Sequence, residues 1–308
     1  MPVDPSIQVL LDSLAASDAP ELSDQSVEEA RAMMALLTLV DGEPEPVDDV
    51  TTRTLPGPAG DIPVRVYRNH GDGPLPVLVW YHGGGWVIGD LESGDPTARK
   101  LANRTGAVVV SVDYRLAPEH PYPAAVDDCW AALEWVAAHA GEIGGDPARL
   151  AVGGDSAGGN LSAVVALLAA QAGGPALRHQ LLVYPVVDLT LSHPSIESNG
   201  EGHLLTKKAM EWFVDHYLGD TDPKDPRISP LYADDLSGVA PATIYTAEFD
   251  PLRDEGAAYA ERLADARVEC EHRCFDGMIH GFFGMGTITP VALEAVDAAS
   301  ARLRSSFS

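Results

Sequence analysis

The sequence is poor in basic residues and in long apolar runs, and each shortage excludes a class of partner. Its 308 residues include 20 Lys and Arg against 46 Asp and Glu, a formal net charge of −26. Such an excess repels phosphate backbones and anionic lipid headgroups, so we expect no nucleic acid partner. No apolar run approaches the roughly 18 residues of a membrane span, and the longest, such as residues 107–110, are strand-length. We therefore expect no membrane partner either.

Cysteine is scarce as well. Cys129, Cys270 and Cys274 are odd in number and show no spacing with histidine that is typical of a metal site. No Lys or Arg precedes Arg31, so the first residues lack the basic segment of a secretory signal. We expect reduced, packed thiols in a cytoplasmic protein that requires neither a metal nor an organic cofactor.

The sequence does contain a regular alternation of short apolar runs with Ala-rich helical patterns. Four runs are almost continuously apolar, as strands buried on both faces are: residues 77–81, 108–112, 150–152 and 181–184. Helical patterns occupy residues 124–140, the segment after Ser156, and residues 254–265. This alternation predicts one α/β domain over residues 1–308, with a mostly parallel sheet covered by helices on both faces.

The ends of this sheet have predictable roles. Residues 64–67, Val-Arg-Val-Tyr, alternate apolar with polar, as a half-exposed edge strand does. In a doubly wound sheet the active site lies at the carboxyl ends of the parallel strands. We therefore look for chemistry in the residues that directly follow the apolar runs.

Two segments interrupt the alternation and predict a cap over the site. In residues 1–45, Ser26 lies three residues before Glu29, a capping-box spacing, and leads into a helical pattern at residues 30–40. Residues 190–222 combine a polar loop with an amphipathic stretch at 207–217. Long insertions in compact domains often cover active sites, so we expect these two segments to form a helical lid.

The central chemical signal is Gly154-Asp155-Ser156-Ala157-Gly158, between an apolar strand and a long helical pattern. A serine on a sharp strand-to-helix turn needs small neighbours, because the strained backbone crowds adjacent strands. Its hydroxyl then lies at a helix N-terminus, where unpaired N–H groups favour negative charge. Ser156 is therefore the candidate nucleophile.

A second signal, His82-Gly83-Gly84-Gly85, follows the strand at residues 77–81. Consecutive glycines let backbone amides approach a substrate without an intervening Cβ atom, as an oxyanion hole requires. This motif accompanies the serine turn in lipases and esterases. The pair of motifs predicts acyl transfer.

A serine nucleophile needs a base and an orienting carboxylate, which follow the serine in this type of fold. His280 lies in a loop after the alternating strand pattern at 268–275, whereas His272 lies within that pattern and is expected on the strand surface. For the carboxylate, the strand at 241–247 leads into Glu248 and Asp250. Pro251 ends the strand pairing, which favours Asp250, but Glu248 remains an alternative at this point.

The motifs HGGGW, GDSAGGN, YRLAPEHPYPAA, DPLRDEG and DGMIHGF together resemble the hormone-sensitive-lipase-like carboxylesterases, bacterial family IV of the α/β-hydrolase superfamily. The resemblance covers about residues 60–305, and the cap segments match the family in position only. It implies Ser156 as nucleophile, Asp250 as the acid and His280 as the base. It also implies an oxyanion hole of the amides of Gly83, Gly84 and Ala157, a supporting role for residues 113–123, and a homodimer through about residues 268–304.

The resemblance implies a small-molecule ester of short to medium acyl length as substrate. Apolar residues beside the motifs or in the lid are candidates for the acyl pocket: Trp86, Val87, Ile88, Leu204, Leu205, Trp212, Phe213, Phe282 and Phe283. An amidase using the same triad is an alternative, because the chemistry alone does not select the leaving group. A non-catalytic receptor on this fold is disfavoured, since His280 stands in its motif.

Overall fold

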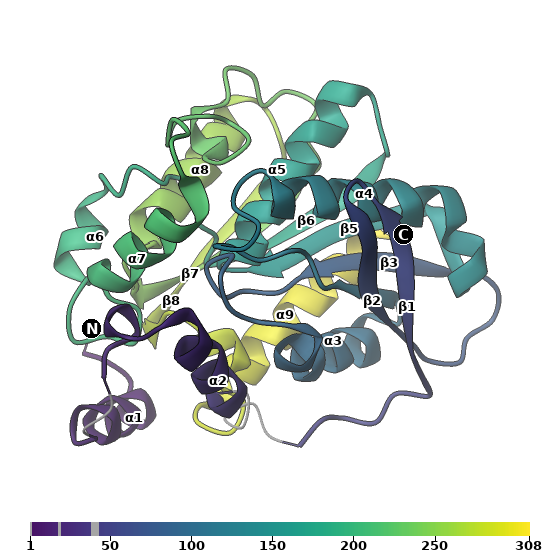
Figure 1. Cartoon of the computed structure of the whole chain (residues 1–308). Helices are drawn as coiled ribbons and strands as arrows, with labels where there is room; N and C mark the ends of the chain where they lie inside the picture. The colour runs from purple at the N-terminus through teal and green to yellow at the C-terminus, as the bar shows by residue number, and fades with distance from the viewer. Residues whose placement is uncertain (1, 18–19, 38–42) are drawn as a thin grey trace.

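A central sheet of eight strands organises the molecule (Figure 1). The computed structural model describes residues 2–17, 20–37 and 43–308. Within these residues the strands are β1 (Asp49–Gly57), β2 (Gly60–Arg68), β3 (Leu75–Tyr81), β4 (Val108–Val112), β5 (Gly145–Asp155), β6 (Leu177–Val183), β7 (Ala242–Phe249) and β8 (Cys270–Ile279). Their order is β1-β2-β4-β3-β5-β6-β7-β8, and all neighbours from β4 to β8 pair in parallel.

The antiparallel end of the sheet differs from the sequence-based expectation. β2 pairs with both β1 and β4, so it lies inside the sheet, and β1 forms the edge. The prediction of an edge strand at residues 64–67 was wrong because Arg65 does not face open solvent. Its guanidinium forms an ion pair with Asp95 on the helix that covers this face, at 3.2 Å. A strand covered by a helix that carries a carboxylate can therefore show the same alternation of apolar and polar residues as a strand exposed to solvent.

Helices lie on both faces of the sheet. The α-helices in the described residues are α1 (Pro5–Ala15), α2 (Val27–Leu37), α3 (Leu91–Thr105), α4 (Ala124–His139), α5 (Ala157–Ala172), α6 (Pro194–Ser198), α7 (Lys207–Leu218), α8 (Arg253–Asp265) and α9 (Pro290–Ser306). Short 3-10 turns occupy Leu22–Asp24, Ala140–Ile143, Pro230–Tyr232 and Phe282–Gly284. Helices α3 and α9 cover one face, and α4, α5 and α8 cover the other (Figure 1).

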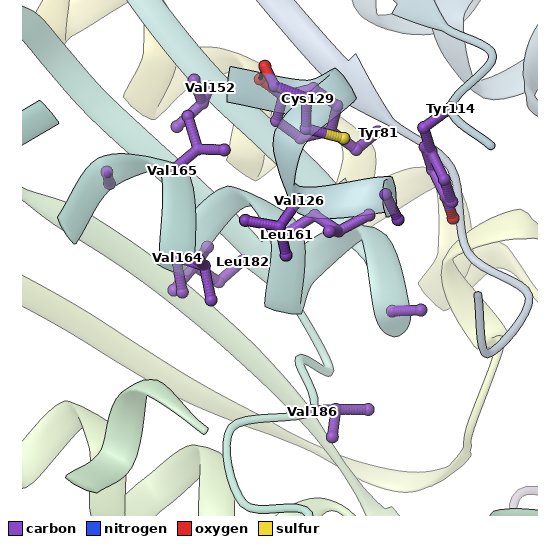
Figure 2. Packing of buried hydrophobic residues seen from close by; sticks show 14 of the residues in the cluster. Tyr81, Tyr114, Val126, Cys129, Val152, Leu161, Val164, Val165, Leu182 and Val186 are labelled. Carbon is purple, nitrogen blue, oxygen red and sulfur yellow. Dashed lines mark hydrogen bonds between the residues drawn. The ribbon is translucent and has the colours of Figure 1, made fainter. Parts of the chain in front are cut away.

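The strand sequences explain why two layers of helices form. Along β3, Val77 and Val79 pack into the core under α4 and α5, whereas Leu78 and Trp80 pack into the core under α3 and α9. Successive strand residues point to opposite faces, so a continuous apolar run requires cover on both sides. Figure 2 shows Cys129 of α4 and Leu161 of α5 within the first of these cores. The predicted fold class is confirmed.

The segments outside the alternation contribute α1, α2, α6 and α7, which lie on one side of the molecule (Figure 1). The Ser26–Glu29 capping box is present: the Ser26 N–H donates to Glu29 Oε2 at 2.9 Å, and the Glu29 N–H donates to Ser26 Oγ at 3.3 Å. It begins α2, and the expected end of this helix near residue 40 falls outside the described residues. None of the helices described combines the length and apolar character needed to cross a bilayer.

Candidate active site

Ser156 lies on a strained turn between β5 and α5. Its backbone has φ 56° and ψ −118°, a conformation that is uncommon for a residue with a side chain. The Ser156 N–H donates to the Val183 carbonyl at 2.9 Å, and the Ser156 carbonyl accepts the Asn160 N–H at 3.0 Å. The turn is therefore hydrogen-bonded on both sides, which holds the hydroxyl at the carboxyl end of β5.

The glycines that flank Ser156 permit a close approach of two backbones. A Cβ atom on Gly158 would lie 1.9 Å from the Tyr81 carbonyl oxygen, and one on Gly154 would lie 2.4 Å from the same atom. Tyr81 ends β3, the strand that leads into the glycine-rich loop. These two positions thus bring the serine turn against the loop that was expected to form the oxyanion hole.

Asp250, His280 and Ser156 form one hydrogen-bonded chain although they lie far apart in the sequence. His280 Nδ1 lies 2.8 Å from Asp250 Oδ2, and His280 Nε2 lies 3.0 Å from Ser156 Oγ. Asp250 is fully buried, and the imidazole side chain of His280 is 12% exposed. The Leu252 N–H donates to the other oxygen of Asp250 at 2.8 Å, which fixes the carboxylate.

This arrangement favours one tautomer of the His280 imidazole. An ionised carboxylate can only accept, so the proton of the neutral imidazole is on Nδ1. The lone pair of Nε2 is then directed at the Ser156 hydroxyl. The arrangement can remove a proton from Ser156 Oγ. The hydroxyl, the imidazole and the Asp250 carboxylate form an unbroken row in which each group is hydrogen-bonded to the next.

Two nearby carboxylates have other partners. Glu248 Oε2 accepts the Gly277 N–H at 2.8 Å, so the alternative acid binds the backbone of β8 and not the His280 imidazole. Glu255, in the first turn of α8, is fully buried. Burial raises the pKa of Glu255 well above its usual range. Its Oε1 accepts the N–H groups of Val187 and Asp188 at 2.7 and 3.2 Å.

The glycine-rich loop lies beside Ser156. Gly83 and Gly84 line the same cavity as Ser156. The Gly83 N–H donates to Asp155 Oδ1 at 3.1 Å, so this amide already has an acceptor in the protein. Ala157 is the first residue of α5, a position whose N–H has no acceptor within its own helix. The three expected oxyanion residues therefore lie beside Ser156, and the Gly83 amide donates to Asp155.

His82 and Tyr114 support this loop from behind. The rings stack with centroids 4.4 Å apart, and the Tyr114 hydroxyl donates to the His82 carbonyl at 2.8 Å. Burial lowers the pKa of His82, and its Nδ1 donates to the Gly83 carbonyl at 2.7 Å. In the following segment, the Ala117 N–H donates to the Trp86 carbonyl at 2.9 Å. These contacts give residues 113–123 a structural role behind the loop.

A cavity of about 600 Å³ opens at Ser156 and His280. Of the apolar residues expected in a substrate pocket, Leu204, Leu205, Phe213 and Phe283 line it. The others belong to the protein interior and need correction: Trp86, Val87, Ile88 and Phe282 are buried in the cores, and Trp212 packs against one of them. Trp86, for example, is fully buried and its ring stacks on Tyr217 with centroids 4.3 Å apart.

The roof of this cavity comes from the segments outside the alternation. Leu10, Leu11 and Leu14 of α1 line it, with Met33 and Met34 of α2. Phe213 of α7 also lines the cavity. Helix α6 instead packs against α8. Its Ser195 Oγ donates to the Pro251 carbonyl, so this half of the insertion braces the loop that carries Asp250.

Comparison with known proteins agrees with this architecture. A family model described as alpha/beta hydrolase fold matches residues 78–284. This chain belongs to the α/β-hydrolase family. It is 47% identical over 292 residues to the carboxylic ester hydrolase LipN of Mycobacterium tuberculosis, covering 92% of this chain and 77% of LipN. It is 44% identical over 317 residues to the carboxylesterase NlhH of the same species, covering 98% and 95%.

A solved structure gives the same result for this α/β hydrolase. A serine-to-alanine mutant of LAE6, an alpha/beta hydrolase enzyme from the metagenome of Lake Arreo, superposes with a TM-score of 0.96 at 41% identity. The match covers 99% of this chain and 98% of that chain. The predicted resemblance to carboxylesterases of this superfamily is confirmed.

Two residues of the α/β-hydrolase site were missed by sequence reasoning. The Tyr184 ring lies 4.5 Å from the His280 ring, and its position directly after β6 was a signal of the same kind as that of Ser156. Asn199 donates from Nδ2 to the carbonyls of Glu248 and Asp250, both at 3.1 Å. Its place in a polar loop gave no signal. In the described part of the chain, no group of three or more His, Cys, Asp or Glu side chains is arranged to hold a metal ion.

Proposed function

We propose that this α/β hydrolase is a serine carboxylesterase that hydrolyses small esters of short to medium acyl length through an acyl-enzyme. The observation that carries the proposal is the hydrogen-bonded chain from Asp250 through His280 to Ser156 at a largely apolar cavity. In this proposal Ser156 is the nucleophile, His280 the general base and Asp250 the residue that orients the imidazole.

Acylation begins with the transfer of the Ser156 proton to His280 Nε2 while Oγ attacks the ester carbonyl carbon. The carbonyl electron pair moves to the oxygen, and the amides of Gly84 and Ala157, with a shared contribution from Gly83, stabilise the resulting oxyanion. Asp250 stabilises the imidazolium without accepting its proton. Collapse of the intermediate breaks the bond to the alcohol oxygen, which takes the proton from Nε2.

Deacylation repeats the sequence with water. His280 removes a proton from a water molecule as the water oxygen attacks the acyl carbon. The second oxyanion is stabilised by the same backbone amides. Collapse releases the carboxylic acid and returns the proton to Ser156 Oγ. Only the chain's own groups and water enter these steps. A general base typically raises the rate about 10²–10⁴-fold and an oxyanion donor about 10²–10³-fold. These contributions account for catalysis without a further chemical group.

The cavity supports the proposed substrate range. A wall of leucine and methionine side chains around about 600 Å³ suits a small apolar acyl group. We propose that α1, α2 and α7 act as the cap under which this group binds. An acyl-length series on purified protein is expected to peak at short or medium chains. A sharp rise in rate above the micelle-forming concentration of a long-chain ester would contradict this range and indicate an interfacial lipase.

Location and assembly belong to the same proposal. Cys129, Cys270 and Cys274 are free thiols, as suits a cytoplasmic enzyme. β8 is the last strand in the sheet order and α9 follows it, so this edge supports the expected homodimer. Sedimentation equilibrium tests the assembly directly, and a single species of 32.6 kDa would contradict it.

The decisive test replaces Ser156. We expect Ser156→Ala to remove the burst of p-nitrophenol from p-nitrophenyl butyrate and to lower kcat by about 10⁴-fold or more. Ser300→Ala is the matched control, because Ser300 is fully buried on α9 and its hydroxyl has no partner among the described residues. It should retain wild-type kinetics. Full turnover by purified Ser156→Ala would end the proposal, and faster cleavage of a matched amide than of the ester would redirect it to an amidase.

A further inference from the structure

Arg31 joins the N-terminal helices to the glycine-rich loop through a single guanidinium group. Its Nε donates to the Val87 carbonyl at 2.9 Å, and Nη2 donates to the Ala117 carbonyl at 3.1 Å. Both Nη atoms also reach the Glu119 carboxylate, at 2.8 and 2.7 Å. One side chain of α2 therefore contacts both the loop after β3 and the segment that supports this loop.

Glu119 fixes the orientation of this guanidinium. Hydrogen bonding to Arg31 lowers the pKa of Glu119 to about 2, so its carboxylate is ionised at neutral pH. A two-point bond between a planar guanidinium and a carboxylate sets the plane of the fork, which a single point contact cannot do. With the plane set, Nε is aimed at the Val87 carbonyl.

Val87 belongs to a tight turn that begins at Gly84. The N–H groups of Val87 and Ile88 both donate to the Gly84 carbonyl, at 3.1 and 2.9 Å. Gly84 has φ 114°, and a Cβ atom there would lie 2.1 Å from the Ile88 carbonyl oxygen. The turn has little room to adjust, so a displacement of Val87 is passed on to Gly84.

The same helix also forms part of the cavity wall. Met33 and Met34 of α2 line the cavity that contains Ser156. Apolar contacts of this kind have no directional preference, whereas the hydrogen bond from Arg31 requires one position of the helix. The position of α2 that completes the cavity wall is therefore also the position in which Arg31 bonds to the Val87 carbonyl.

We propose that Arg31 is a positioning residue that couples the seating of α2 over the cavity to the alignment of the oxyanion hole. Its guanidinium holds the Val87 carbonyl, and through the turn it holds Gly84 in the orientation that stabilises the oxyanion. Arg31 acts on the reaction only through the backbone at Val87 and Ala117. The inference rests on the proposed function, because it concerns the donors of that reaction's oxyanion hole.

The test compares Arg31→Ala and Arg31→Lys in the full-length protein, with active sites counted by a fluorophosphonate probe. We expect Arg31→Ala to lower kcat for p-nitrophenyl butyrate by about 10-fold and kcat/KM equally, because the lost alignment matters only in the transition state. KM should stay within about twofold. Arg31→Lys should recover less than half of the lost rate, since one ammonium cannot bind both carbonyls and the carboxylate.

Arg149 provides a matched control. It donates to the Asp146 carboxylate at 2.7 Å and to the Pro74 carbonyl at 2.6 Å. Its side chain is 32% exposed, against 33% for Arg31. Arg149 lies near the start of β5, at the end opposite Ser156. Arg149→Ala should change the Tm about as much as Arg31→Ala does and leave kcat within about twofold of wild type.

The outcomes separate this inference from the function on which it rests. Wild-type kcat per labelled site in Arg31→Ala would overturn the inference alone, and so would a raised KM with unchanged kcat. Complete rescue by Arg31→Lys would overturn the role of the planar fork. A wild-type protein that neither hydrolyses esters nor reacts with the probe would overturn the proposed function and this inference together.

Discussion

Helices α1 and α7 both contribute to the roof of the cavity, yet they are attached to the molecule in opposite ways. Five residues of α7 are buried: Ala209, Met210, Phe213, Tyr217 and Leu218. In α1 only Ile7 is buried. Because burial of apolar side chains is the main source of stability, the two helices cannot be equally difficult to displace.

The attachment of α7 continues the main core. Tyr217 stacks on Trp86 with ring planes 5° apart, and both side chains are fully buried. A Cβ atom on Gly85 would lie only 2.2 Å from the Phe213 ring. α7 therefore packs directly on the backbone of the glycine-rich loop and is expected to unfold only with the whole domain.

The attachment of α1 is local. Ile7 packs into the core under α3 and α9, and the Asp4 N–H donates to the Gly277 carbonyl at 3.0 Å. Val9 and Leu14 remain 66% and 39% exposed. We infer that α1 opens at a lower free energy than α7.

The largest effect is expected at the centre of the α7 attachment. Tyr217→Ala should lower the free energy of unfolding by about 4 kcal/mol, because it leaves a cavity beside Trp86 in the main core. Urea denaturation followed by circular dichroism measures the loss. Tyr217→Phe is the control: the Tyr217 hydroxyl is buried without a hydrogen-bond partner in the described residues, so its removal should be neutral or slightly stabilising. A loss below about 1 kcal/mol in Tyr217→Ala would remove the distinction between the helices.

A smaller global effect is expected from the corresponding change in α1. Ile7→Ala removes about 3 kcal/mol of local packing, but the global loss cannot exceed the free energy at which α1 already opens. We expect faster hydrogen exchange and proteolysis in residues 5–15, with a global change below about 1 kcal/mol. A global loss equal to that of Tyr217→Ala would show that α1 is as integral to the core as α7.

The smallest effect concerns substrate binding at the exposed end of α1. Leu14 lines the cavity, so Leu14→Ser should raise KM for p-nitrophenyl butyrate about threefold and change stability by less than about 0.5 kcal/mol. Val9→Ser is the matched control, since Val9 lies on the same helix and is mostly exposed. Equal KM values for the two variants would mean that Leu14 does not contact the acyl group.

The serine turn and the glycine-rich loop were predictable because each depends on local backbone constraints. The turn at Ser156 needs glycine at positions 154 and 158, and no other residue type could bring this turn against Tyr81. Such constraints restrict the residue types at fixed positions, so they can be recognised in the sequence. His280 was predicted from its loop after a strand, while the choice of Asp250 over Glu248 as its partner needed either the family resemblance or the observed bond to His280.

The pocket was predicted poorly because proximity along the chain does not determine the side on which a side chain lies. Trp86 and Ile88 lie within five residues of Gly83 and Gly84 but face the core, whereas Leu10 and Met33, far away in the sequence, line the cavity. The prediction of an edge strand at residues 64–67 was wrong for a related reason. The polar residue Arg65 was paired with a covering helix, and no pattern within residues 64–67 distinguishes this from exposure to water.

The sequence by itself determined the fold class and the serine turn, because strand burial on two faces and close backbone approach each restrict residue type at fixed spacing. Tertiary structure alone decided which apolar side chains face the cavity and that Arg31 of a distant helix contacts the Val87 carbonyl. These are contacts between segments tens to hundreds of residues apart. They depend on how the helices dock on the sheet, and docking is set by the packing of the whole core.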